Sequence, residues 1–138
     1  MNLVMKKLQG GDVTAWQYFN YCLAQQVSEY LGACDSHVQA TYTFDYDATP
    51  EDVIFSDQVR DRLIHILVWV SRKTAALETL VRALDAALCE SYVQRLGISR
   101  PKHVLDIQVV DDTEVQERTG YGALLASIHR QPLKIWSR

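Results

Sequence analysis

The amino-acid sequence predicts a two-layer α+β sandwich, in which a mostly antiparallel sheet carries two long amphipathic helices on one face. Two segments show helical periodicity, two others alternate apolar and polar residues, and the two kinds of segment interleave along the chain. A length of 138 residues suits one domain, so residues 1–138 are treated as a single α+β domain that ends in a C-terminal extension.

The first helix is predicted over residues 13–31. Its apolar positions recur at three- and four-residue steps, and they are Trp16, Phe19, Leu23, Val27, Tyr30 and Leu31. Asp12 or Thr14 can cap its start, and Gly32 is the expected end. The segment before it, 2–8, fits either a short edge strand or a helical lead-in.

The clearest strand is predicted over residues 37–47. Its apolar positions, Val38, Ala40, Tyr42, Phe44 and Tyr46, alternate with polar ones. This period of two predicts that one face lies in a core and that the other face meets water. Such alternation favours antiparallel pairing over a doubly covered parallel sheet.

Residues 62–96 hold the densest apolar run of the chain and then its cleanest amphipathic helix. The run 62–70 is predicted as a strand because it is short and rich in β-branched residues. The alternative is one long helix from about residue 56 to residue 96. The helix proper is predicted over 74–96, with Thr74 as its N-cap and Gly97 as its end.

The remaining chain predicts a second alternating strand over 103–110 and an edge strand over 133–136. Between them, 123–130 fits either two helical turns or a strand. If residues 2–8 form a strand, the element order is that of a ferredoxin-like sandwich. Element order does not determine function.

Composition narrows the class of protein. The net charge of −3 and the absence of a basic stripe argue against nucleic-acid binding. The longest apolar run, Leu63–Val70, is far too short to span a membrane. The three cysteines are far apart and form no CxxC pair, so we expect reduced thiols and a cytoplasmic protein.

Five carboxylates define a candidate metal site. Asp45 and Asp47 end one predicted strand, and Asp111, Asp112 and Glu114 follow another. If those strands are neighbours, the oxygens could converge on Mg²⁺ or another divalent cation. The site would then suit an enzyme acting on a phosphate-bearing substrate. Strand ends and turns attract aspartate in any case, so no cofactor is predicted outright.

A glycine-containing turn defines a candidate anion site. Gly120 and Gly122, beside Arg118, could present backbone N–H groups to an anion in a small-ligand sensor. The segment lacks a complete GxGxxG motif and a P-loop lysine, so it carries no nucleotide fingerprint.

The sequence contains no recognisable set of catalytic residues. The four histidines form no HxxxH or HxH pair, and Cys34 with His37 supplies only half of a zinc site. No nucleophile has a base near it in the sequence.

Leu63, His65, Leu67 and Trp69 form the second face of the strand 62–70 and define a candidate interface. Something must cover these apolar residues, and the C-terminal segment, a second subunit or a partner protein could do so. The sequence therefore predicts a small cytoplasmic binding or accessory protein that acts through protein–protein association as a homo-oligomer, with a homodimer as the preferred state.

Overall fold

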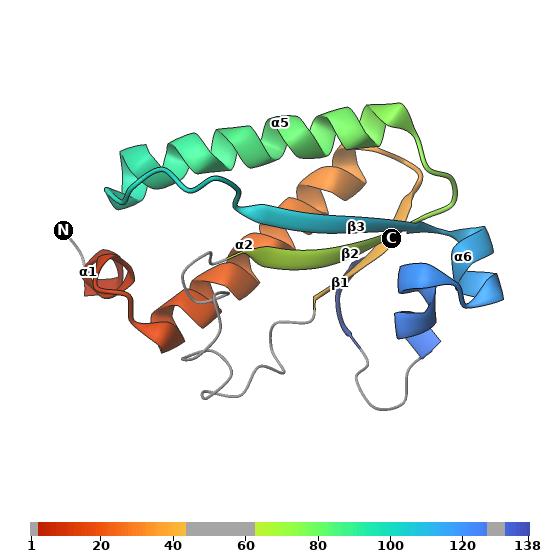
Figure 1. The fold of residues 1–138 in the computed structure, drawn as a ribbon, viewed down its shortest axis with the longest axis horizontal. Coiled ribbons are helices and arrows are strands. Elements are labelled where there is room, and N and C mark those ends of the chain that lie inside the picture. The colour runs from red at the N-terminus through yellow and green to blue at the C-terminus, as the bar shows by residue number, and fades with distance from the viewer. Residues whose placement is uncertain (1–2, 44–62, 127–131) are drawn as a thin grey trace.

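The computed structural model describes residues 3–43, 63–126 and 132–138. Its elements in chain order are α1 (Leu3–Gln9), α2 (Val13–Cys34), β1 (Val38–Thr43), β2 (Ile64–Val70), α5 (Ala75–Ser91), η2 (Tyr92–Leu96), β3 (Leu105–Asp111), α6 (Asp112–Glu117), η3 (Gly120–Ala126) and β4 (Leu133–Ser137). One sheet with the order β3-β2-β1-β4 forms the centre (Figure 1). The helices α2 and α5 pack on the same face of it, which confirms the predicted fold class.

The sheet is mixed and mostly antiparallel. β1 pairs antiparallel with both β2 and β4, and β2 pairs parallel with β3. The parallel pair requires a crossover connection, and α5 supplies it. The strand predicted at 62–70 is confirmed by β2, so the alternative of one continuous helix from residue 56 is wrong.

The N-terminal segment is helical. α1 ends before Gly11, whose φ of 77° lies in the left-handed region. The Nε1–H of Trp16 donates to the carbonyl of Leu8 at 2.8 Å and ties α1 to α2. Because residues 3–9 form a helix and not a strand, the ferredoxin-like element order is not formed.

α2 begins as predicted and ends later than predicted. The Asp12 carboxylate accepts the N–H of Ala15 at 2.8 Å and caps the helix. Gly32 does not end the helix, which continues to Cys34. The glycine instead lets the indole ring of Trp136, on β4, lie directly against α2.

The predicted distribution of β1 side chains between the two sheet faces is wrong. A register shift between Val38 and Ala40 turns the strand, so that Ala40 lies opposite Trp69. Thr41 and Thr43 are buried on the helix-covered side, where polar residues were expected to meet water. The Thr41 hydroxyl donates to the Ser28 hydroxyl of α2 at 2.6 Å, and this bond satisfies it away from water.

α5 matches the prediction at its start and changes geometry near its end. Thr74 accepts the N–H of Leu77 and caps the helix. The last turn is the π-helix η2, and Gly97 closes it with a φ of 66°. Glycine adopts this left-handed conformation without steric cost.

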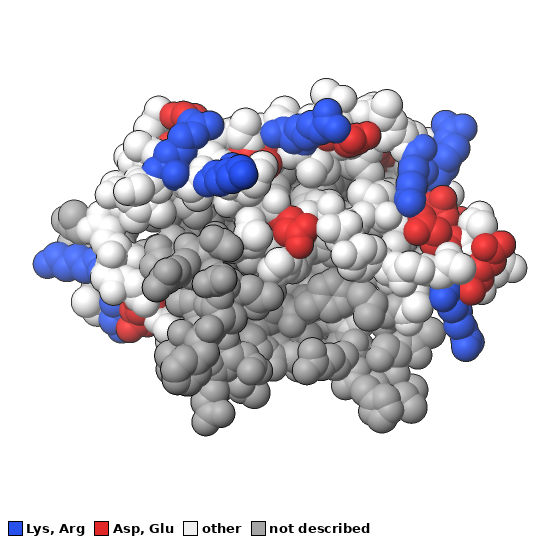
Figure 2. Space-filling model, in the orientation of Figure 1, with Lys and Arg blue, Asp and Glu red and all other residues white. Residues whose placement is uncertain are grey.

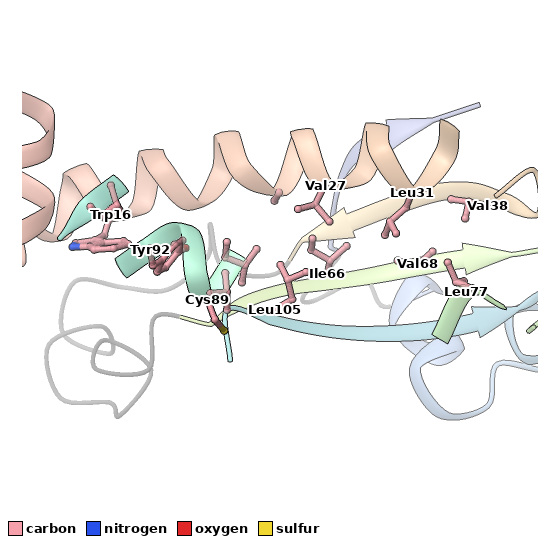
Figure 3. Close-up of a cluster of buried hydrophobic side chains, with 14 of the residues drawn as sticks. Trp16, Val27, Leu31, Val38, Ile66, Val68, Leu77, Cys89, Tyr92 and Leu105 are labelled. Carbon is pink, nitrogen blue, oxygen red and sulfur yellow. The ribbon is translucent and has the colours of Figure 1, made fainter. Parts of the chain in front are cut away.

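The main core lies between the sheet and the two long helices. Figure 3 shows Val27 and Leu31 of α2 directed toward Ile66 and Val68 of β2. Leu77 of α5 joins the same cluster, and each of these residues is at most 3% exposed. Complete removal of such side chains from water is the main source of stability for a domain of this kind.

Candidate functional site

The outer face of α2 combines exposed tyrosines with almost no charge. Among the helix's 22 residues, the only charged side chain is Glu29. Three tyrosines are exposed on it, Tyr18 by 72%, Tyr30 by 48% and Tyr21 by 37%. An amphipathic helix whose outer side meets only water usually carries charged residues there. At about 100° per residue, Tyr18 and Glu29 lie at the centre of the outer side of α2, with Tyr21 and Tyr30 on its two flanks. This outer face of α2 is therefore a candidate interaction surface.

Hydrogen bonds along the helix hold the tyrosine hydroxyls. The Gln25 amide donates to the Tyr21 hydroxyl at 3.4 Å. A side-chain hydrogen bond with Cys22 raises the pKa of Tyr18, and an equivalent bond with Cys34 raises that of Tyr30. Both shifts favour the protonated phenols of Tyr18 and Tyr30, so the charge on this side of α2 comes from Glu29.

The charged side chains gather elsewhere. α5 carries Glu78, Arg82, Asp85 and Glu90 in its 17 residues. Figure 2 shows charged residues over α5 and around the α6 end of the sheet. Arg82 donates to the Glu78 carboxylate at 2.5 Å along the outer side of α5. The contrast shows that the absence of charge is a property of α2 and not of the whole surface.

The candidate interface on β2 is largely covered by the chain itself. Leu67 is fully buried against Ala40 and Val110, and Val115 and Leu125 pack over this group. The Trp69 Nε1–H donates to the Asp112 carboxylate at 2.8 Å. Leu63 is half-buried at the start of the strand. α6 and η3 thus cover the apolar half of this sheet face, and Leu67 is not available to a partner.

His65 lies in a polar group on the same sheet face. Its Nδ1 is 2.7 Å from an Asp106 carboxylate oxygen, directly across the parallel β2–β3 pair. The Gln108 amide donates to the other oxygen of Asp106 at 2.9 Å. Sequence reasoning missed this triplet, because nothing in the two separate strands reveals that His65 and Asp106 share a register.

We compared the chain with models of protein families, with curated proteins and with solved structures. None of the three comparisons gave a match. No helix in the described ranges is both long and apolar enough to cross a membrane.

The three carboxylates of the candidate metal site that the structure describes, Asp111, Asp112 and Glu114, all have partners within the protein. Asp111 caps α6 by accepting the N–H of Glu114 at 2.9 Å. Asp112 accepts both the Trp69 indole N–H and the Gln39 amide, and Glu114 forms an ion pair with Lys73. Within residues 3–43, 63–126 and 132–138, no three His, Cys, Asp or Glu side chains are placed to hold a metal ion.

Asp45 and Asp47 lie outside the described residues. A metal site that combines them with the three carboxylates around α6 therefore stays a prediction, as does an enzyme built on it.

The glycine turn is closely packed. The Gly122 N–H donates to the Thr119 carbonyl at 2.9 Å, so this N–H is already occupied. A Cβ on Gly122 would lie 2.4 Å from the Glu114 carbonyl oxygen, which explains the need for glycine there. Arg118 adopts a left-handed φ of 57° as the C-cap of α6. These contacts give the turn a packing role, and anion binding by Arg118, Gly120 and Gly122 stays a prediction.

A second histidine–carboxylate pair joins α5 to the start of β3. The Asp85 carboxylate accepts the N–H groups of Val104 and Leu105 at 2.7 and 2.9 Å, and it lies 2.8 Å from His103 Nδ1. Burial acts to raise the pKa of Asp85, but these hydrogen bonds and the His103 charge lower it overall. Cys89, one helical turn further on, is buried, and burial raises the pKa of its thiol. A protonated, buried thiol is a poor nucleophile, so Cys89 adds no reactive group beside Asp85 and His103. The contacts of Asp85 with His103, Val104 and Leu105 form a structural tether between α5 and β3.

Proposed function

We propose that this chain is a binding or accessory protein that associates with another protein through the outer face of α2. One observation supports the proposal above the others: three exposed tyrosines share a helix that has a single charged residue. Protein interfaces are enriched in tyrosine and depleted in lysine, glutamate and aspartate relative to the rest of the surface.

Tyrosine suits this role for a physical reason. Its ring offers a large apolar area, its hydroxyl can form a hydrogen bond with a partner, and few torsions are frozen on binding. Tyr18 and Tyr30 are separated by about 18 Å along the axis of α2 and by about 120° around it, so a partner touching both would wrap around part of the helix. We expect the energy of association to concentrate at these aromatic positions.

The charge of the face also restricts the partner. Nucleic-acid binding draws most of its affinity from lysine and arginine contacts with phosphates. α2 has no lysine or arginine, and its only charge, Glu29, is negative. The surface that fits this face is therefore a largely uncharged protein surface.

Site-specific photo-crosslinking tests the proposal. Tyr18 is replaced by p-benzoylphenylalanine in the cells that make the protein, and the exposed Thr79 of α5 is replaced in the same way as a matched control. We expect a discrete protein adduct at position 18 that is absent at position 79. Introducing Tyr21→Lys in addition should remove the adduct, because it places a charge beside Tyr18, one helical turn along α2.

Two results would contradict the proposal. One is an adduct pattern at position 18 no stronger than that at position 79. The other is an adduct that survives Tyr21→Lys unchanged. An adduct between two copies of this chain would identify the partner as a second copy.

A further inference from the structure

β3 is an edge strand that lacks several of the features that usually prevent pairing with another chain. It lies at one border of the sheet, beside β2 and below α5 in the view of Figure 1. Its sequence, Leu105–Asp111, contains no lysine, no proline and no irregularity in its pairing with β2. Edge strands of natural proteins usually carry such features, because unpaired main-chain groups recruit other strands.

The opposite edge of the same sheet is protected. β4 is two residues shorter than β3, follows Pro132 and carries Lys134. Its pairing with β1 is interrupted by a register shift between Thr41 and Tyr42. The two edges of one sheet thus differ in length, in proline and lysine content and in the regularity of their pairing, while β3 keeps the charged residues Asp106 and Asp111.

The hydrogen bonds of β2 fix which main-chain groups of β3 point outward. The Ile64 N–H donates to the Val104 carbonyl at 2.9 Å. In a strand, the main-chain N–H and C=O groups of every second residue point toward the same neighbouring strand. The main-chain groups of Asp106, Gln108 and Val110 therefore also point toward β2. The N–H and C=O groups of Ile107 and Val109 therefore point away from the sheet.

The start of this edge is already occupied. The outward N–H of Leu105 donates to the Asp85 carboxylate at 2.9 Å. In the part of the chain that the structure describes, no comparable bond is seen for the N–H groups of Ile107 and Val109. The unprotected stretch is thus the middle of β3.

We infer that β3 pairs antiparallel with β3 of a second copy, with Gln108 facing its own equivalent at the two-fold axis. Ile107 of each copy then exchanges main-chain hydrogen bonds with Val109 of the other. This inference does not rest on the proposed function, which concerns α2.

Charge and overlap select this register. With Gln108 on the axis, the middle of β3 overlaps its copy, and Asp106 lies opposite Val110, while the N–H of Leu105 stays with Asp85. Centring the pair on Asp106 would instead set two carboxylates against each other, which is destabilising. A patch that is complementary to itself is what a two-fold dimer requires. The occupant that best fits this edge is therefore a second copy of the chain.

A cysteine at the axis tests the inference. Gln108 pairs with its copy at a position without main-chain hydrogen bonds, where Cα atoms lie about 4.5 Å apart. A disulfide can span Cα separations of about 4.4–6.8 Å. We expect Gln108→Cys, in a background of Cys22→Ser and Cys34→Ser, to form a disulfide-linked dimer rapidly with copper phenanthroline. Cys89 stays in place because it is buried.

The matched control is Asp106→Cys in the same background, on the same face of the same strand. In the inferred register the new thiol of Asp106→Cys would face Val110 of the second copy, so this variant should link at least tenfold more slowly than Gln108→Cys. Equal rates would show random collision and overturn the inference.

A charge at the axis gives an independent readout. Gln108→Lys opposes two ammonium groups and should make the protein monomeric at concentrations where the unmodified chain is dimeric. A Gln108→Lys dimer of unchanged affinity would also overturn the inference.

Discussion

The carboxylate of Asp85 holds the first residue of β3 by accepting the N–H of Leu105 at 2.9 Å. The same oxygen accepts the N–H of Val104 at 2.7 Å, and the other oxygen lies 2.8 Å from His103 Nδ1. One side chain of α5 thus fixes where the edge strand begins. It also occupies the outward N–H of Leu105, which a neighbouring strand would otherwise use.

The first prediction concerns the pH dependence of stability at Asp85. The pKa of Asp85 is lowered in the folded protein, so the unfolded chain binds a proton more tightly. The stabilisation is therefore complete above the unfolded pKa of about 3.9 and is lost as the pH falls through the lower folded value. We expect Asp85→Asn to reduce the free energy of unfolding by about 1–3 kcal/mol near pH 7.

Denaturant unfolding across pH checks this prediction. The difference between the two proteins should shrink as the pH falls below about 4. Glu78→Gln serves as the control, because the exposed Glu78–Arg82 pair should contribute less than about 1 kcal/mol. A difference at Asp85 that does not change with acidification would contradict the role given to its charge.

The second prediction concerns the contact between α2 and β4. A Cβ at Gly32 would lie 2.3 Å from two ring atoms of Trp136. The indole is rigid, so Gly32→Ala should destabilise the fold by about 1–3 kcal/mol through overpacking. Thermal or chemical unfolding measures this change.

A double-mutant cycle isolates that contact. Trp136→Leu removes the ring atoms that the new methyl group would meet. Added to Trp136→Leu, Gly32→Ala should therefore cost clearly less than it costs in the unmodified chain. If the two changes are additive, the close approach of Trp136 is not the reason for glycine at this position.

Local periodicity was sufficient to predict most of the fold. The three-to-four-residue spacing in α2 and the β-branched run of β2 each identified the correct element, because these signals are contained in one segment. The faces of β1 were predicted wrongly, because the register shift after Val38 depends on its partner strand. Gly32 was misread as a helix end, since its reason for being glycine is Trp136, more than a hundred residues away.

The candidate surfaces also differ in whether their features are contained in one segment or depend on tertiary structure. The uncharged stretch of α2 is visible in the sequence, although only the exposure of Tyr18 and Tyr30 distinguishes it from a buried helix. The pairs His65–Asp106 and Asp85–His103 could not be predicted, because tertiary structure alone brings their members together. At the candidate interface, the sequence left open whether the C-terminal segment, a second subunit or a partner covers Leu67, and in the structure Val115 of α6 and Leu125 of η3 pack over it.

Sedimentation velocity of the unmodified chain over a wide concentration range tests most directly whether the chain associates with itself through β3. We predict a dimer that forms reversibly as concentration rises, that is lost in Gln108→Lys and that is retained in the surface control Thr79→Lys. A single monomeric species at every concentration, up to the highest that remains in solution, would contradict self-association of this chain.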